Sequence, residues 1–163
     1  METGLEGRVV LITGASGGIG SAIARHFAAE GAKLVLHYRS SRANIENLVR
    51  TSKSENAISV QADLTKESQV RQIFAQVLKR FGRVDTLIAN AGSWSRTMSH
   101  FTKCPFANGR TLSTMCLVAR PEDIASAVVF FASDLLAGHI TGQTVVIAGG
   151  MEGRLLWPTE LQK

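Results

Sequence analysis

Three glycines near the N-terminus, in the segment TGASGGIG (13–20), have a spacing suited to phosphate chemistry. Gly14, Gly18 and Gly20 follow an apolar run and precede an alanine-rich segment with helical periodicity. In such an arrangement, backbone amides can approach a pyrophosphate at the positive N-terminus of a helix. Tight turns also need glycine, so a plain strand-to-helix turn is the alternative interpretation. The apolar run before the turn and the helical pattern after it favour a phosphate site.

Strand and helix patterns alternate along the chain and must position this turn. Continuous apolar runs predict strands covered on both faces, and periodic apolar stripes predict helices. The predicted strands are 8–13, 33–38, 57–63, 84–90 and 144–148, and the predicted helices are 21–31, 43–53, 66–81 and 121–133. This alternation indicates a parallel sheet with right-handed crossovers.

We therefore expect a single α/β domain with a doubly wound sheet of about five strands. The predicted order is 3-2-1-4, with the last strand beside the fourth. The helices 21–31 and 43–53 are expected on one face of the sheet, and 66–81 and 121–133 on the other. The domain is expected to cover residues 1–150, and residues 151–163 form a tail. Residues 93–119 have no sustained period and are interpreted as an irregular junction or loop, which in a compact domain is usually functional or poorly ordered.

The glycine spacing gives the sequence a resemblance to the short-chain dehydrogenase/reductase family. Further matching motifs are AD (62–63), NAG (90–92), RPEDIASAVVFFASD (120–134) and ITGQTVVIAGG (140–150). With the glycine-rich turn, these motifs cover residues 5–92 and 120–150. The resemblance implies a Rossmann-like sheet and an activity in which hydride passes between a nicotinamide dinucleotide and an alcohol or carbonyl compound.

The same resemblance implies which residues bind the dinucleotide. The phosphates would be held by Gly14, Ser16, Gly18, Ile19 and Gly20. The adenine would be flanked by Asp63 and Leu64, and the path toward the nicotinamide would be lined by Asn90, Ala91 and Gly92. Asp63 also suits a capping role before the next helix, and the two roles can coexist.

The end of the second predicted strand bears on the choice between NAD and NADP. An acidic residue there accepts hydrogen bonds from the ribose hydroxyls and repels a 2′-phosphate. This chain instead has Tyr38, Arg39 and Ser40, and a guanidinium suits the extra phosphate of NADP. The alternative is that Arg39 and Arg42 are solvated surface charges. We expect NADP as the cofactor, with NAD less favoured.

The family's chemistry uses a serine and a Tyr-x-x-x-Lys pair, in which the lysine lowers the pKa of the tyrosine. Tyr38 is the one tyrosine of this sequence, and Arg42 follows four residues later. We therefore assign no catalytic residue, and we interpret the region after Gly92 as the junction left by an internal deletion. Three hypotheses remain: an NADP(H)-binding protein with impaired catalysis, a truncated or misspliced fragment without independent function, and an active carbonyl reductase or alcohol dehydrogenase with an unrecognised site.

Composition limits the remaining function classes. The 163 residues carry a formal charge of +5 and are 45% hydrophobic, which is typical of a globular chain. The sequence lacks a basic run interleaved with aromatic residues, so we do not expect nucleic acid as a partner. It also lacks an apolar run of about 18 residues, so we do not expect a membrane span. The N-terminus lacks the pattern of an export signal, so we expect a cytoplasmic location.

Cysteine and histidine give no sign of a metal site. Cys104 and Cys116 are isolated, which favours reduced thiols over a disulfide or metal ligands. The four histidines lack paired spacing, and each is interpreted as a surface or packing residue. The expected partners are the dinucleotide and, because apolar surface near the fourth strand would be left uncovered, a second copy or a longer relative.

Overall fold

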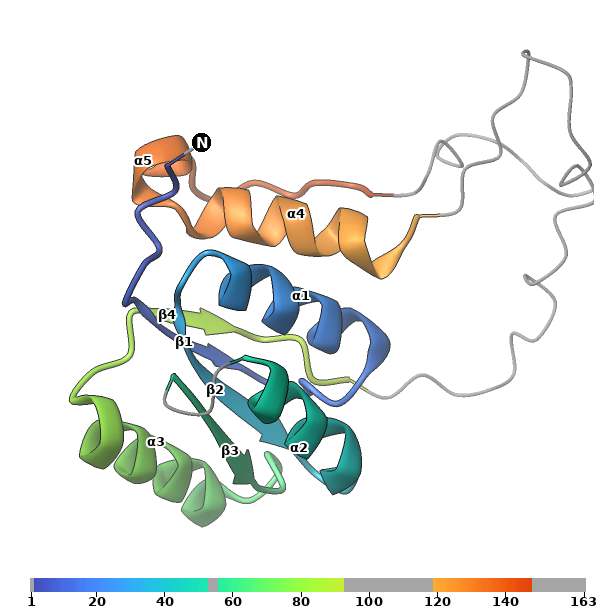
Figure 1. Ribbon diagram of the computed structural model, residues 1–163, viewed down its shortest axis with the longest axis vertical. Coiled ribbons are helices and arrows are strands. Elements are labelled where there is room, and N and C mark those ends of the chain that lie inside the picture. The colour runs from blue at the N-terminus through green and yellow to red at the C-terminus, as the bar shows by residue number, and fades with distance from the viewer. Residues whose placement is uncertain (1, 53–55, 93–118, 148–163) are drawn as a thin grey trace, which may run out of the picture.

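The computed structural model describes residues 2–52, 56–92 and 119–147 (Figure 1). Its strands are β1 (Val9–Ile12), β2 (Lys33–Tyr38), β3 (Ala57–Gln61) and β4 (Thr86–Ile88). Its helices are α1 (Gly18–Ala29), α2 (Arg42–Thr51), α3 (Glu67–Phe81), α4 (Pro121–Ala132) and α5 (Asp134–Ala137). The strands are parallel and lie in the order β3-β2-β1-β4. The expected α/β fold class and the order of the first four strands are confirmed.

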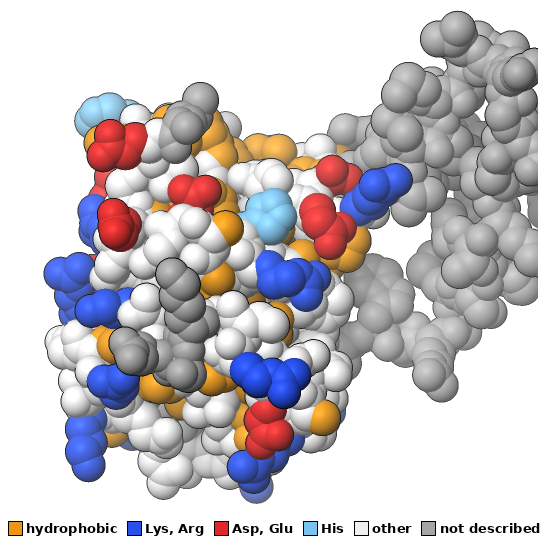
Figure 2. Space-filling view, in the orientation of Figure 1, with side chains coloured by type: hydrophobic (Ala, Val, Ile, Leu, Met, Phe, Trp, Pro, Cys, Tyr) orange, Lys and Arg blue, Asp and Glu red, His pale blue; other side chains and the backbone are white. Residues whose placement is uncertain are grey.

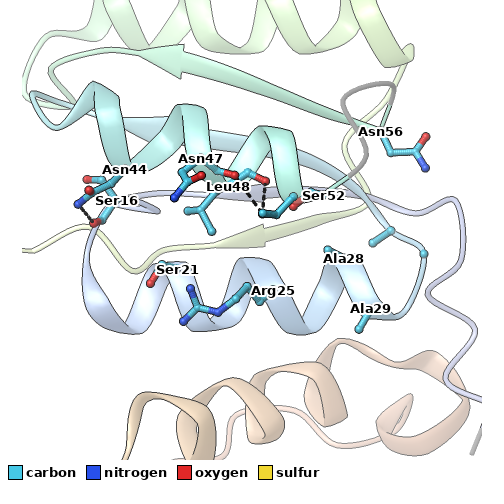
Figure 3. A pocket seen from close by; sticks show the side chains of 13 residues that line it. Ser16, Ser21, Arg25, Ala28, Ala29, Asn44, Asn47, Leu48, Ser52 and Asn56 are labelled. Carbon is cyan, nitrogen blue, oxygen red and sulfur yellow. Dashed lines mark hydrogen bonds between the residues drawn. The ribbon is translucent and has the colours of Figure 1, made fainter.

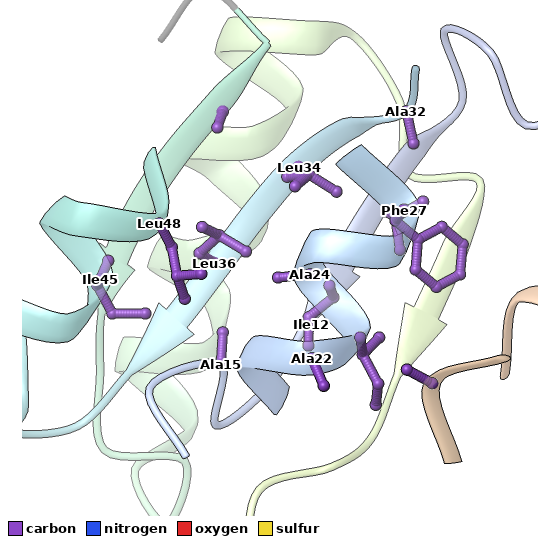
Figure 4. Close-up of a cluster of buried hydrophobic side chains, with 14 of the residues drawn as sticks. Ile12, Ala15, Ala22, Ala24, Phe27, Ala32, Leu34, Leu36, Ile45 and Leu48 are labelled. Atoms are coloured by element: carbon purple, nitrogen blue, oxygen red, sulfur yellow. The ribbon is translucent and has the colours of Figure 1, made fainter. Parts of the chain in front are cut away.

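The two central strands are buried on both faces because their residues are apolar almost without interruption. Every residue of β1 is buried, as are the last five of β2. Alternate side chains along each strand point to opposite faces, so β1 supplies two separate cores. One core lies against α1 and α2 and includes Ile12, Leu36 and Phe27 (Figure 4). The other lies beneath α3 and includes Leu11 and Val77.

Helix α4 lies on the same side of the sheet as α1, against the expectation that it would cover the opposite face. Ala125 of α4 is fully buried in the core that α1 and α2 also cover, and Figure 1 shows α4 alongside α1. Helix α4 has apolar side chains around most of its surface, and two of them, Phe130 and Phe131, are partly exposed. Because a helix of that kind has no single apolar stripe, its packing face could not be assigned from periodicity.

The expected last strand, 144–148, is not formed in its described part. Residues 144–147 have no strand partner, and Val145 and Val146 are exposed. Since α4 packs on α1, the chain that leaves α5 runs back along α4 instead of reaching β4 (Figure 1). The sheet therefore has four strands in the described part of the chain, with β4 at one edge.

Interactions distant in sequence hold the end of α4 to the first strand. Arg8, just before β1, forms an ion pair with Asp134 of α5 at 2.6 Å. The hydroxyl of Ser133 donates a hydrogen bond to the Thr3 carbonyl at 2.7 Å. Where the structure is described, its helices are all too short or too polar to cross a membrane.

Candidate functional site

The glycine-rich turn follows β1 and passes into α1. Gly14 has a positive φ of 64°, which favours glycine. A Cβ built on Gly14 would lie 2.9 Å from the Ala91 Cα, and one on Gly20 would lie 2.4 Å from the Gly14 carbonyl oxygen. A Cβ on Gly18, in contrast, would meet no atom within 4 Å from the rest of the described residues outside its own helix. Two of the three glycines are therefore required by packing, whereas the third leaves open space at the start of the helix.

Thr13 and Asn90 bind the turn to the end of β4. The Asn90 amide nitrogen Nδ2 donates to the carbonyls of Thr13 at 2.9 Å and Gly14 at 3.2 Å. The Thr13 hydroxyl oxygen accepts from the backbone amides of Asn90 and Ala91, each at 2.9 Å. The same hydroxyl donates to the Ile88 carbonyl at 3.1 Å. These bonds fix the turn against the neighbouring strand.

A cavity of about 700 Å³ lies at the carboxyl ends of the strands. In open α/β sheets this edge is where ligands bind. The cavity is lined by twelve of the thirteen residues predicted to bind the cofactor: Gly14, Ser16, Gly18, Ile19, Gly20, Arg39, Ser40, Asp63, Leu64, Asn90, Ala91 and Gly92. The structure thus brings together motifs that are separated by more than 70 positions in the sequence.

Tyr38 is the one predicted residue that does not line this cavity. It is 5% exposed and belongs to the core beneath α1 and α2. Its carbonyl accepts a hydrogen bond from the Ala62 amide at 3.1 Å, as strand pairing requires. The alternation along β2, in which neighbouring residues face opposite sides of the sheet, places Tyr38 on the same face as Leu34 and Leu36, toward α1 and α2.

Five cavity-lining residues were not predicted: Gly17, His37, Ala62, Thr65 and Pro121. Gly17, Ala62 and Thr65 adjoin predicted residues in the sequence, so their positions could have been included with those motifs. Pro121 comes from the start of α4, and only the tertiary structure places it there. His37 was interpreted as a surface or packing residue, and its exposure of 2% fits the second of these alternatives. Its position inside an otherwise apolar strand was the available signal.

The carboxylate of Asp63 organises the turn before α3. Its Oδ1 atom accepts hydrogen bonds from the Thr65 hydroxyl at 2.8 Å and the Thr65 amide at 3.1 Å. These bonds, with lesser contributions from Lys66 and Arg39, lower the pKa of Asp63 from its ordinary value. The N-cap of α3 is Lys66, so Asp63 stabilises the turn before the helix and does not cap it directly. Asp63 is therefore a charged group on the cavity wall at neutral pH.

Arg39 and Arg42 have different environments. Arg42 forms an ion pair with Glu46 one helical turn away, at 2.7 Å, and this hydrogen bond raises the pKa of Arg42. Arg39 lines the cavity, and among the described residues no carboxylate lies within 4 Å of its guanidinium. The alternative interpretation as a surface charge therefore fits Arg42 better than Arg39.

A second cavity, of about 640 Å³, lies between α1 and α2 (Figure 3). Its wall combines small apolar residues with hydroxyl and amide side chains, and Ser16 borders both cavities. Asn44 donates to the Ser16 carbonyl at 3.4 Å, which ties α2 to the glycine-rich turn. On the face drawn in Figure 2, acidic and basic side chains are interspersed.

The turn, the parallel strands and the cavity define a nucleotide-binding α/β protein. A family model described as short chain dehydrogenase matches residues 8–112, and the chain belongs to this family. An uncharacterized oxidoreductase of Methylorubrum extorquens is 43% identical over 90 residues, which cover 54% of this chain and 36% of that protein. The versicolorin reductase of Emericella nidulans is 42% identical over 90 residues, covering 54% and 34%. The matched segment thus spans about a third of these relatives' length.

Solved structures agree with this assignment. A short-chain dehydrogenase from Brucella melitensis, named glucose/ribitol dehydrogenase, has a TM-score of 0.54 and 33% identity, covering 58% of this chain and 40% of that one. A 3-ketoacyl-(acyl-carrier-protein) reductase of the same organism, complexed with NADH, has a TM-score of 0.51 and 42% identity, covering 54% and 36%. The family membership supports an oxidoreductase fold that binds a nicotinamide dinucleotide.

Proposed function

We propose that this chain binds NADP(H) in the cavity at the carboxyl ends of its strands. The observation that best supports this proposal is that the three glycines of the turn differ in how closely other atoms surround them. Gly14 and Gly20 are required by close packing, but a Cβ on Gly18 would meet no atom of the described residues within 4 Å outside its own helix. A phosphate needs such space to reach the backbone amides at a helix N-terminus. A plain turn explains the first two glycines and gives no reason for the third.

The proposed preference for NADP rests on Arg39. This guanidinium lines the cavity next to Ser40, at the end of the strand where an acid would favour NAD. A charge-assisted contact with the 2′-phosphate is worth more than a neutral hydrogen bond. The reductase of Brucella melitensis was solved with NADH, so its structure supports a nicotinamide dinucleotide as the class of cofactor. The preference between NAD and NADP is argued from the residues of this chain.

Arg39→Ala and Arg42→Ala form a matched pair for testing this preference. Saturation at 100 times the dissociation constant stabilises a protein by about 2.7 kcal/mol, which is visible as a rise in melting temperature. We expect NADPH to raise the melting temperature more than NADH does at equal concentration. Arg39→Ala should abolish that difference, while Arg42→Ala, whose arginine pairs with Glu46, should retain it. Equal shifts with both cofactors in the unmutated chain would refute the preference.

We further propose that the bound dinucleotide does not react at a normal rate. Tyr38 lies in the core, where its phenol has no access to a substrate in the cavity. Ser93, Ser95, Ser99 and Lys103, which follow the NAG motif, lie outside the described residues. A positioned acid or base contributes roughly 10²–10⁴-fold to a rate, and orientation contributes more. A chain without the tyrosine and lysine of its family should therefore bind the cofactor without turning it over.

A turnover assay tests this second part. Purified chain is mixed with NADPH and a panel of ketones and aldehydes, and the cofactor absorbance is followed. We expect no turnover above that of Gly18→Asp, whose carboxylate would occupy the phosphate position. NADPH oxidation that depends on the carbonyl compound and disappears in Gly18→Asp would identify an active reductase. A cytoplasmic location, where NADPH is available, is part of the same proposal.

A further inference from the structure

His37 is a buried titratable residue that the proposed binding of the cofactor does not use directly. It lies on β2, the strand between β1 and β3 (Figure 1), and it is 2% exposed. Its ring contacts both neighbouring strand ends. Nδ1 accepts a hydrogen bond from the Gly14 amide at 3.2 Å, and Nε2 lies 3.0 Å from the Ala62 carbonyl oxygen.

These two partners select one form of the imidazole. A carbonyl oxygen only accepts, so Nε2 must carry a proton to bond with Ala62. The Gly14 amide only donates, so Nδ1 must be without a proton. Both bonds exist together only in the neutral tautomer with its hydrogen on Nε2. The protonated ring has a hydrogen on each nitrogen, which would set two donors against each other at Nδ1.

His37 also holds the next residue of the turn. Its backbone carbonyl accepts from the Ala15 amide at 2.9 Å, so two successive amides of the turn bond to one residue of β2. The conformation that they fix includes the positive φ of Gly14. That turn forms one wall of the first cavity, and His37 itself lines the cavity beside it.

We propose that His37 is a positioning residue for the dinucleotide, and that protonation of its ring releases the Gly14 amide and weakens binding. The charged residues that line the cavity around it are Arg39, from the end of β2, and Asp63, after β3. The glycine-rich turn and the segment from β4 to Gly92 contribute none. The pKa of Asp63 is lowered by its hydrogen bonds to Thr65, so its carboxylate stays charged. The imidazole of His37 gains its charge when a proton is added at Nδ1, the atom that accepts from the Gly14 amide.

Two variants separate positioning from structural support. His37→Asn places an acceptor oxygen at the position of Nδ1 and does not titrate, so it retains the bond to Gly14 at every pH. His37→Phe keeps the ring shape and removes both polar atoms. The probe is NADH, because the 2′-phosphate of NADPH would itself titrate near pH 6. This arm of the experiment rests on the proposed dinucleotide function.

Binding of NADH is measured by calorimetry between about pH 8 and about pH 5.5, the range in which histidines ordinarily titrate. We expect the unmutated chain to lose about tenfold in affinity on acidification, the equivalent of one buried hydrogen bond. The NADH affinity of His37→Asn should change less than about threefold over this pH range, and His37→Phe should bind NADH weakly at both ends of the range. An equal loss in the unmutated chain and His37→Asn would overturn the proposal.

A ligand-free measurement tests the same residue without the cofactor. Long-range ¹⁵N–¹H correlation spectra of the imidazole should show the proton on Nε2 at about pH 8. Exchange of the Gly14 amide hydrogen, corrected for its intrinsic pH dependence, should accelerate on acidification in the unmutated chain and not in His37→Asn. A proton on Nδ1, or a Gly14 amide insensitive to pH, would overturn the proposal. If neither NADH nor NADPH binds at any pH, the proposed function fails and the Gly14 exchange alone decides the role of His37. If NADPH binds and NADH does not, the proposed function stands and the Gly14 exchange again decides the role of His37.

Discussion

At the scale of single residues, the glycine-rich turn contains two glycines that close packing requires, Gly14 and Gly20, and one that packing does not require, Gly18. Gly20 lies where a Cβ would approach the Gly14 oxygen at 2.4 Å and the Asn90 Nδ2 at 2.7 Å. Gly18, two residues earlier in the same helical turn, has no neighbour within 4 Å of a Cβ among the residues described outside α1. Their chemistry is identical, so a comparison of the two isolates the effect of crowding.

We expect Gly20→Ala to lower the free energy of unfolding by about 1–3 kcal/mol, because the turn and Asn90 must move apart. Gly18→Ala should change it by less than about 1 kcal/mol, since the methyl group meets open space. Urea denaturation of both variants checks this. Equal destabilisation by the two substitutions would mean that the turn does not pack against β4 as described.

Asp63 gives a pH prediction whose direction follows from its hydrogen bonds. The Thr65 hydroxyl and amide stabilise the carboxylate and lower the pKa of Asp63. Its contribution to stability is therefore present above the ordinary aspartate pKa of about 3.9, and is lost only as the pH falls through the lowered value. Thr65→Val removes the hydroxyl and keeps the amide, so it should raise the pKa of Asp63. A ¹³C carboxyl titration with the same midpoint in both proteins would contradict this.

Which site residues could be predicted depends on how local their signal is. Gly14, Gly18 and Asn90 belong to short contiguous motifs, and the structure places all three at one cavity. Tyr38 also adjoins a motif, but strand alternation turns its side chain into the core. The function of His37 depends on hydrogen bonds to two other segments. Hydrogen bonds between distant segments cannot be predicted from a local sequence pattern.

At the scale of elements, the sequence predicted the helices and the first four strands better than it predicted how they pack. The strands β1 and β2 are continuous apolar runs, and α3 has a clear apolar stripe that ends at Gly82, whose φ is 78°. Helix α4 has no comparable stripe, so its contact with α1 was not foreseen. The absent pairing of 144–147 follows from that contact, because the position of α4 determines where the chain returns.

The contact between α1 and α4 is tested at Ala125, which is fully buried. Ala125→Asp would bury a charge against α1 without a partner, and we expect it to cost about 2–4 kcal/mol of unfolding free energy. Ser126→Asp is the control, since Ser126 is exposed on the same turn and should change stability by less than about 0.5 kcal/mol. Chemical denaturation measures both. If Ala125→Asp lowered the unfolding free energy as little as Ser126→Asp does, α4 would not be packed on α1.

At the scale of the whole molecule, one side of the sheet has less cover than the other. Helices α1, α2 and α4 share one face, and among the described helices only α3 packs on the opposite core. Leu87 of β4 is in register with Leu11, so it points to the α3 side, where it is 54% exposed. Leu78 of α3 is 52% exposed. Leu87 thus leaves apolar surface on the fourth strand uncovered in the described part of the chain.

Exposed apolar side chains favour association, and we expect the chain to form oligomers or to have low solubility. Leu87→Lys combined with Leu78→Lys should shift the average mass in light scattering toward the monomer. Gln76→Lys, which replaces an exposed polar residue on α3, is the control and should leave the mass unchanged. A monomer in the unmutated chain at high concentration would contradict this prediction.

The central claim is that the cavity beside the glycine-rich turn binds NADP(H), and calorimetric titration of the purified chain with NADPH tests it most directly. Gly18→Asp is the control, because a Cβ at that position meets no atom within 4 Å in the described part of the chain outside α1, while a carboxylate there would repel the pyrophosphate. We predict saturable heat with one NADPH per chain and no heat in a folded Gly18→Asp variant. No binding by the unmutated chain, or equal binding by both proteins, would contradict the claim.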